Sequence, residues 1–431
     1  MKKIVKILPL AFAGLMTLAA CNQGGTQEKS YGDVSTKITI WATAAEEAVI
    51  KAVVDEYNAK KTDEKEKFQY DFKAVSEGDC GSTLSKDPTV AGAPALALVA
   101  DDQIYGLQSK SIILELKGTY KEGVKANNSA VAVTGASYGD QLFGFPVTSD
   151  NGYFLWYNAD AITAEQAKSL ESIIAVCKEK NMKFNMELAN GYYVASVFMS
   201  PQVCGIESLK FSSDAEGKVS YTVNWDNEQG AAAAEAISTL LAPEYVSGLF
   251  TDGGNEAVIK GFTDGDMIAA ISGTWLESGL TEAAEKQNFK LAATKLPTFK
   301  VGNEEKQMAS FSGSKVYVIN KTRPVAEQKV AAALADLLTN KESQLKRFEL
   351  RKTLPCNLEA AKDEKYTKNV SISGAALQEQ NQFAAVQSTS AQDRYWKVGE
   401  TIGTAMRDAD KGEMTWAQFI KSQLDTLRAA L

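Results

Sequence analysis

The stretch that decides the fold is KITIWATAAEEAVIKAVVDEYNA, residues 37–59. Its start predicts a short strand, because Ile38, Ile40 and Trp41 are of the residue types that favour strands. A helix over residues 44–58 follows, since its apolar side chains recur at helical spacing: Val49, Ile50, Val53, Val54 and Tyr57. A strand joined directly to a helix is the repeating unit of an α/β fold.

Two more strands follow this unit. Residues 68–74 alternate between apolar and polar side chains, and residues 95–100 form a continuous run of small apolar ones. A continuous apolar run suits a parallel strand that is buried on both faces. Residues 104–110 open the next helix. The order strand, helix, strand, helix, strand predicts a parallel sheet with right-handed crossovers.

The rest of the chain keeps alternating between strands and helices. Residues 143–160 contain two extended pieces, residues 190–193 a turn, and residues 299–314 a loop-like return to a strand at 315–320. The last third is mainly helical and ends in an amphipathic helix that starts near Trp416. Alternation of strands and helices, typical of an α/β fold, therefore extends well beyond the opening unit.

Composition excludes several classes of function. The 431 residues allow two or three domains, and 45% apolar with 23% charged residues is ordinary for a globular protein. With no His, the chain has no Ser-His-Asp or Cys-His nucleophile and no His-ligated zinc or haem. The formal charge of −8 argues against a nucleic-acid partner. No metal or organic cofactor is expected.

The first 20 residues are predicted to be a signal peptide. A basic start with Lys2, Lys3 and Lys6 precedes an apolar run that is too short for a membrane span. The run ends Leu18-Ala19-Ala20-Cys21, which resembles a bacterial lipobox, so Cys21 is the expected lipidation site; an ordinary secretory signal with a chance Cys is the alternative. Residues 21–36 are expected to form a flexible tether that leaves the protein outside the cytoplasmic membrane, held by lipid alone.

Four cysteines remain after Cys21, namely Cys80, Cys177, Cys204 and Cys356. An exported protein can form disulfides, and four cysteines allow three pairings. The sequence does not choose among these pairings, or between them and four unpaired thiols.

Five segments together resemble one family. Their order and spacing are similar to those of bacterial extracellular solute-binding proteins of ABC importers, in the maltose/maltodextrin-binding branch. The segments are residues 37–59, 93–116, 143–160, 265–280 running on to 295–299, and 391–403. The resemblance implies two α/β lobes around a ligand cleft, with chain crossings near Pro146 and Pro297. It divides the chain into an N-lobe, 37–147 plus 302–350, and a C-lobe, 151–296 plus 354–431.

The resemblance also implies a function. Such proteins are non-enzymatic monomers that bind a sugar or oligosaccharide and deliver it to membrane permease subunits. A sugar ring has an apolar face that packs on an aromatic side chain, and hydroxyls that need donors and acceptors. A hinged cleft supplies both kinds of group.

In the N-lobe, the expected ligand-binding residues follow the buried strand at 95–100. Ligands of such sheets bind beyond the carboxyl ends of strands, although Asp101 and Asp102 could instead cap a helix. By resemblance, Asp102 and Gln103 stand where the family has an Asp-Arg pair, and the charge of that Arg is lost. An aromatic platform is also lost at Val99.

In the C-lobe, the resemblance places aromatic ligand-binding residues at Trp275, Trp396 and Tyr192. Tyr395 and Tyr193 are the alternatives to the last two, and Asn190 replaces an acid that precedes Tyr192 in the family.

By resemblance, the position at which the family has a carboxylate in the cleft corresponds to Asp150 or Asn151. Trp41, which ends the first strand, and Glu77, after the second, are weaker candidates. The family's Lys near the first helix has no counterpart, because Glu46 and Glu47 stand there.

Three other functions remain open at this stage. Asp101, Asp102 and Asp150 could supply the two carboxylates of a glycoside hydrolase. The same fold could bind a peptide or a polyamine through acidic residues. A lipid-anchored adhesin or sensor subunit is the third option.

Overall fold

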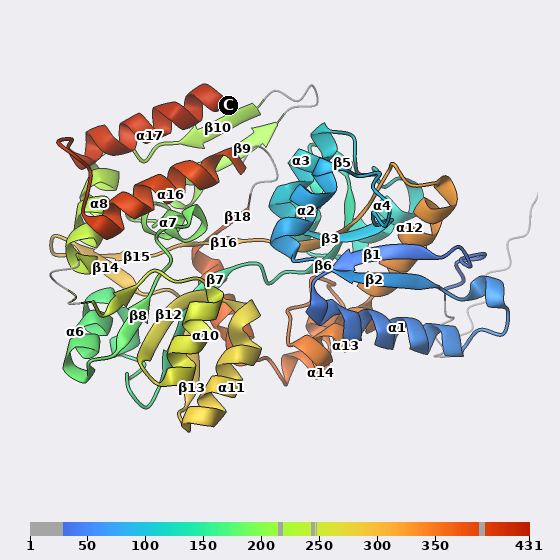
Figure 1. Ribbon diagram of the computed structural model, residues 1–431, viewed down its shortest axis with the longest axis horizontal. Coiled ribbons are helices and arrows are strands. Elements are labelled where there is room, and N and C mark those ends of the chain that lie inside the picture. Colours follow the sequence, from blue (N-terminus) through green and yellow to red (C-terminus); the bar gives the residue numbers. More distant parts are fainter. Residues whose placement is uncertain (1–28, 214–218, 243–245, 247, 388–392) are drawn as a thin grey trace, which may run out of the picture.

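The computed structural model describes residues 29–213, 219–242, 246, 248–387 and 393–431 (Figure 1). Two lobes lie side by side, each built on a five-stranded sheet with helices on its faces. Among these described residues, no helix is long and apolar enough to cross a membrane. The predicted signal peptide and Cys21 lie outside the described residues.

The N-lobe sheet has the strand order β2-β1-β3-β17-β6. The strands are β1 (Ile38–Ala42), β2 (Tyr70–Ala74), β3 (Leu96–Ala100), β6 (Gly144–Thr148) and β17 (Lys315–Ile319). The first three strands pair in parallel, as the sequence predicts. β17 is antiparallel to both β3 and β6, so the sheet is mixed and not purely parallel. The reason is that β17 enters this lobe from the other one, at the edge where β3 and β6 end.

Helices cover this sheet and complete the N-lobe core. They are η1 (Ala44–Glu46), α1 (Glu47–Ala59), α2 (Glu77–Lys86), α3 (Ile104–Ser109), α4 (Gly118–Asn127), α5 (Ala130–Gly135), α12 (Val325–Thr339) and α13 (Lys341–Arg351). The apolar stripe predicted on α1 is buried in full, from Val49 to Tyr57. Its burial against the sheet is what makes the opening stretch fold as expected.

The C-lobe sheet has the strand order β11-β8-β12-β7-β13. The strands are β7 (Tyr153–Asn158), β8 (Lys183–Asn185), β11 (Phe250–Thr251), β12 (Met267–Gly273) and β13 (Leu291–Thr294). Side chains of β7 alternate between the two faces, as strand geometry requires. Tyr153 and Leu155 join one apolar core, and Phe154 and Trp156 join another on the opposite face.

Two groups of helices cover the two faces of the C-lobe sheet. One face carries α6 (Leu170–Lys180), α7 (Gly191–Phe198), α8 (Glu228–Leu241), α16 (Asp393–Asp408) and α17 (Trp416–Ala430). The other carries α10 (Asn255–Asp264), α11 (Glu277–Gln287), α14 (Glu364–Thr367) and α15 (Ile372–Gln380). The turn expected at residues 190–193 is in fact the start of α7, because Asn190 caps that helix with its side chain.

The expected loop at 299–314 is largely paired strand that belongs to the C-lobe. β14 (Thr298–Val301) pairs with β15 (Glu304–Gln307), and β16 (Ser310–Ser312) pairs with β18 (Ala384–Val386). Phe299, Met308 and Phe311 are buried in the C-lobe core. The N-lobe therefore resumes at Lys315 and not at residue 302.

One of the two expected crossings lies near its proline and the other does not. Pro146 lies within β6, and the chain leaves the N-lobe directly after this strand, at residues 149–152. Pro297 comes directly before β14 of the C-lobe, and the return to the N-lobe lies at residues 313–314. Pro146 is tolerated in β6 because this strand lies at the edge of the sheet, where a missing N–H need not break a ladder.

Residues 29–36 are not a free tether. Val34 is 1% exposed in the N-lobe core, and its N–H donates to the carbonyl of Lys65. Tyr31 packs on the same lobe through its ring and its hydroxyl. The folded N-lobe thus begins earlier than the boundary predicted at residue 37.

A buried ion pair joins the two ends of the N-lobe sequence. Arg347 Nε lies 3.1 Å from both carboxylate oxygens of Glu46, and both side chains are at most 1% exposed. Arg351 and Tyr317 also contact this carboxylate. Burial alone would raise the pKa of Glu46, but the two guanidinium groups outweigh it and hold the pKa below its ordinary value. The cluster ties the start of α1 to α13.

We expect Glu46→Gln to lower the free energy of unfolding by about 3–5 kcal/mol, because Arg347 would then be a buried charge without its partner. The free energy of unfolding should also fall at acidic pH, where Glu46 becomes protonated. A folded pKa below the ordinary value of 4.5 contributes stability above that pH, and this contribution is lost as the pH falls through the folded pKa. Chemical unfolding at several pH values measures both effects.

Glu165→Gln is the matched control. Glu165 pairs with Lys168 at 2.6 Å, but its side chain is 82% exposed, so we expect a change of less than about 1 kcal/mol. Equal losses in the two variants would show that burial of Glu46 does not matter.

Candidate ligand-binding site

The segments that join the lobes are hydrogen-bonded to one another. The N–H of Asn151 donates to the carbonyl of Gly313 at 3.2 Å, and the N–H of Ser149 donates to that of Leu354 at 3.1 Å. Gln387 donates to Ser312 in the same way, at 2.8 Å. These contacts define the interlobe junction, where β3 and β6 end and β17 and β7 begin. Most of the predicted site residues lie at or beside this junction.

Asp101 is the buried acid of the junction on the N-lobe side. It is 1% exposed, and its Oδ2 accepts the Ser314 N–H at 2.8 Å. A Cβ at Gly135 would lie 2.8 Å from Oδ2, and a Cβ at Gly313 would lie 3.0 Å from both carboxylate oxygens. Burial, and then the charge of Asp102, raises the pKa of Asp101 well above its usual range. Both glycines are therefore needed to admit this carboxyl group.

Asp102 and Gln103 diverge in their surroundings although they are neighbours. Asp102 is half-buried at the end of β3 and close enough to Asp101 to shift its pKa. The side-chain amide of Gln103 instead binds the backbone of α2. Its Oε1 accepts the Gly81 N–H at 2.6 Å, and its Nε2 donates to the Gly78 carbonyl at 2.9 Å. The structure thus gives Gln103 a role in holding α2 against the strand end.

An aromatic cluster forms the C-lobe side of the junction. The Tyr192 ring stacks on Phe311 at 5.5 Å and 20°, and Trp396 meets both rings edge-on at 6.0 and 5.7 Å. The Tyr192 hydroxyl donates to the Asn151 carbonyl at 3.2 Å. Burial, followed by the charges of nearby groups that include Asp101 and Asp102, raises the pKa of Tyr192. Asn151 in turn donates its N–H to the Gly313 carbonyl, and Gly313 lies against the Asp101 carboxylate, so the two crossing segments connect this acid to Tyr192.

The two alternative pairs of aromatics differ in exposure. Tyr395 is fully buried and donates to the Gly191 carbonyl, and Tyr193 is 4% exposed. Trp396 and Tyr192 are the half-buried members of the two pairs. They are thus the residues whose surface is partly accessible.

Trp275 lies beyond the carboxyl end of β12. Its ring covers Gly273, where a Cβ would come within 2.2 Å of a ring carbon, and its Nε1 donates to Asn255 Oδ1 at 3.0 Å. The preceding residue, Thr274, donates its hydroxyl to the Asp150 carbonyl at 3.1 Å. Trp275 is half-buried and adjoins the junction.

Asp150 and Asn151 are both part of a crossing segment. Asp150 is 0% exposed, and Lys315 Nζ lies 3.8 Å from its Oδ1. Neither of its carboxylate oxygens has a hydrogen-bond partner among the residues that the structure describes. Asn151 Nδ2 donates to Gln387 Oε1 at 3.3 Å and lies close to Gly313.

The two weaker candidates have different outcomes. Trp41 is 2% exposed in the N-lobe core, and its Nε1 donates to the Gly92 carbonyl at 3.2 Å, so it is a core residue. Glu77 is the first residue of α2, but its side chain lies outside what the structure describes.

Sequence reasoning missed three residues of this region. Phe311 lies in a segment that was expected to be a loop, although its alternation with Ser310 and Ser312 is a strand signal. Glu187 Oε1 accepts from Asn190 at 3.2 Å, so an acid is present beside the position where the family's acid is replaced. Burial raises the pKa of Glu187. Asn255, which binds the Trp275 indole, gave no signal in the sequence.

No disulfide joins any two of the four cysteines that the structure describes. Cys80, Cys177 and Cys356 are buried, and burial raises the pKa of Cys177 and Cys356 to about 12. Within the described part of the chain, no three His, Cys, Asp or Glu side chains are grouped as metal ligands.

Solved structures share this fold at low sequence identity. The maltodextrin-binding protein MalE1 of L. casei is 20% identical with a TM-score of 0.71, over 91% of this chain and 97% of its own. The maltotriose-binding protein of Thermus thermophilus is 15% identical with a TM-score of 0.72, over 91% and 99%. The GacH receptor of Streptomyces glaucescens, solved without ligand and with acarbose, is 15% identical with a TM-score of 0.73, over 92% and 98%.

No curated protein sequence matches the chain. A family model described as bacterial extracellular solute-binding protein matches residues 52–373, which include most of both lobes and the junction. The two-lobe architecture and this match agree with each other. The chain belongs to the family of bacterial extracellular solute-binding proteins.

Proposed function

We propose that this protein captures a sugar or an oligosaccharide between its lobes and delivers it to the permease of an ABC importer. The observation that carries the proposal is an aromatic cluster with half-buried Tyr192 and Trp396 on one side of the junction and the acids Asp101 and Asp102, which follow β3, on the other. Relatives of the same fold bind maltodextrin, maltotriose or acarbose, which supports a sugar as the ligand.

In this proposal the two sides of the junction make different contacts with the sugar. Aromatic faces pack against the apolar face of a sugar ring, and carboxylates accept hydrogen bonds from its hydroxyls. The Tyr192 ring already stacks on Phe311 and is met edge-on by Tyr153, Tyr193 and Trp396, so little of it is left for a ligand. Trp275 and Trp396 are therefore the main stacking residues of the proposal, and Asp102 is the main acceptor.

The surroundings of Asp101 and Asp150 support a protein that binds its ligand without catalysis. A glycoside hydrolase needs one carboxylate to act on the leaving group and a second to act on the sugar or a water. Asp101 receives a backbone hydrogen bond, and Asp150 is fully buried beside Lys315. We therefore propose that these carboxyl groups position the junction and do not perform hydrolysis.

We propose further that Cys21 carries a lipid and that the protein acts as a monomer outside the cytoplasmic membrane. The lipobox sequence before Cys21 supports the anchor. The family of extracellular solute-binding proteins supports the location.

We expect a thermal-shift screen to show stabilisation by sugars and not by peptides or polyamines, because a ligand that binds only the folded state raises the unfolding temperature. With the best sugar, Trp275→Ala and Trp396→Ala should each weaken binding by about 1–3 kcal/mol, the scale of a lost aromatic contact. Asp102→Ala should weaken it by at least about 1 kcal/mol, since a buried sugar hydroxyl would lose its partner. Calorimetric titration measures these changes.

Trp416→Ala is the control for the tryptophan variants. Trp416 is 4% exposed in α17, so its loss should lower the unfolding temperature and leave affinity unchanged while the protein is folded. A Trp275→Ala variant that unfolds early but binds normally would place Trp275 in the core. Stabilisation by a polyamine alone would favour the alternative ligand.

A separate prediction concerns the anchor. Cys21→Ala should release the protein from membranes, because no other attachment is proposed. Fractionation of cells in detergent-free buffer measures the released share. A variant that still sediments with membranes after washing would contradict lipid attachment at Cys21.

A further inference from the structure

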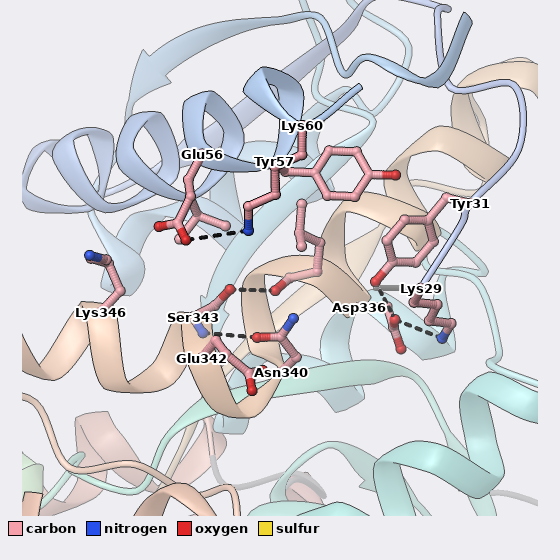
Figure 2. Close-up of a pocket in the computed structure, with 12 residues that line it drawn as sticks. Lys29, Tyr31, Glu56, Tyr57, Lys60, Asp336, Asn340, Glu342, Ser343 and Lys346 are labelled. Atoms are coloured by element: carbon pink, nitrogen blue, oxygen red, sulfur yellow. Dashed lines mark hydrogen bonds and ion pairs between the residues drawn. The ribbon is translucent and has the colours of Figure 1, made fainter. Parts of the chain in front are cut away.

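The first described residues are bound to the outer end of the N-lobe. The Tyr31 hydroxyl donates to Asp336 Oδ2 at 2.7 Å, and Lys29 Nζ lies 2.8 Å from the same oxygen (Figure 2). The Tyr31 ring meets Tyr57 and Phe68 at centroid distances of 5.9 and 5.8 Å. With Val34 buried beside Lys65, these contacts hold residues 29–34 on the lobe.

This attachment lies far from the interlobe junction. Tyr57 is near the end of α1, and Phe68 comes just before β2 begins. Both therefore mark the edge of the sheet where parallel strands start. The junction residues follow the opposite edge, where β3 ends at Ala100. Figure 1 shows the same arrangement, since the far end of α1 lies at the end of the N-lobe that points away from the C-lobe.

The chain that connects this point to Cys21 is short. Eight residue steps separate Cys21 from Lys29, and a fully extended chain covers at most about 3.3–3.6 Å per residue, or about 28 Å in all. A tether that ran to residue 37 would reach about twice as far by the same estimate. The contacts of Tyr31 and Val34 therefore shorten the attachment and fix the place where it leaves the lobe.

A groove of about 710 Å³ lies beside this exit point, lined in part by Tyr31 and Tyr120. Three lysines and two acids also line it, namely Lys117, Lys321, Lys329, Asp33 and Glu115, and Glu115 pairs with Lys117 at 3.2 Å. Val325 in the same lining is 65% exposed. Ammonium groups next to an exposed apolar side chain suit the headgroup region of a bilayer that contains anionic lipid.

We propose that the outer end of the N-lobe, around residues 29–34 and this groove, is the surface that faces the anchoring membrane. The proposal rests on the lipid anchor proposed for Cys21. It places the N-lobe next to the bilayer and the C-lobe, with α17, farther from it. The anchored protein then has a preferred orientation.

The orientation can be measured on the full-length lipidated protein in vesicles of phosphatidylcholine and phosphatidylglycerol that carry a headgroup-linked quencher. A fluorophore is attached to Lys117→Cys in the N-lobe or to Lys421→Cys in the C-lobe. These side chains are 76% and 60% exposed, so neither change disturbs a core. Cys204→Ser removes the half-buried native thiol from both proteins.

We expect the probe at residue 117 to be quenched several-fold more than the probe at residue 421. Tyr31→Ala with Asp336→Ala should reduce this difference, because residues 29–34 would no longer be held on the lobe. Tyr31→Phe keeps the ring contacts and should retain most of it. Unfolding curves and sugar binding show that each variant is folded.

Equal quenching at both positions, or stronger quenching at residue 421, in protein that stays on the vesicles would overturn the orientation. If wild type and Cys21→Ala sediment equally with cell membranes, the lipid anchor itself is wrong, and the orientation argued from it falls too. The two failures are thus seen in different measurements.

Discussion

One topological constraint organises this protein: each lobe receives the chain from the other lobe at the edge where its parallel strands end. A strand that enters at that edge has to run away from it, so β17 in the N-lobe and β7 in the C-lobe are each antiparallel to their neighbours. All the other strands of the two sheets run toward the junction. The loops that follow them deliver Asp101, Glu187 and Trp275 to the same region, which is where open α/β sheets place ligands.

The junction combines groups that are costly to bury with groups that favour burial. Asp101 and Asp150 are carboxyl groups with almost no exposure, and an unpaired charge in such a place destabilises a fold. A backbone N–H compensates the first, and a lysine ammonium lies near the second. The aromatic cluster around Tyr192 and Phe311 supplies apolar contact from the other side. The junction therefore combines buried carboxyl groups with apolar ring contacts.

Local patterns predicted the elements but not their partners. The period of apolar residues identified β1, α1, β3 and α17, because burial on one face shows in the sequence. The antiparallel direction of β17 was not predictable, since a strand's own residues do not record the direction of its neighbours. The same limit explains Trp41, whose position at a strand end suggested a site although its neighbours bury it.

Candidate site residues could be named only where a motif carried them. The resemblance named Trp275, Trp396 and Tyr192, and the structure places all three beside the junction, while their contact with a ligand stays a prediction. Gln103 shows what a motif omits: its position matched, but its amide is used by the backbone of α2. Phe311 was missed because its role comes from contact with Tyr192, which is distant in sequence.

The tight packing around Asp101 has a consequence for how this sequence can diverge. A methyl group at Gly135 or Gly313 would press against the carboxylate, so a larger residue at either position is tolerated only with a smaller one at position 101. Single changes among the three are then penalised, while matched double changes need not be. The three positions should therefore covary among relatives that keep this junction, although they are spread over 213 positions of the chain from Asp101 to Gly313, counting both ends.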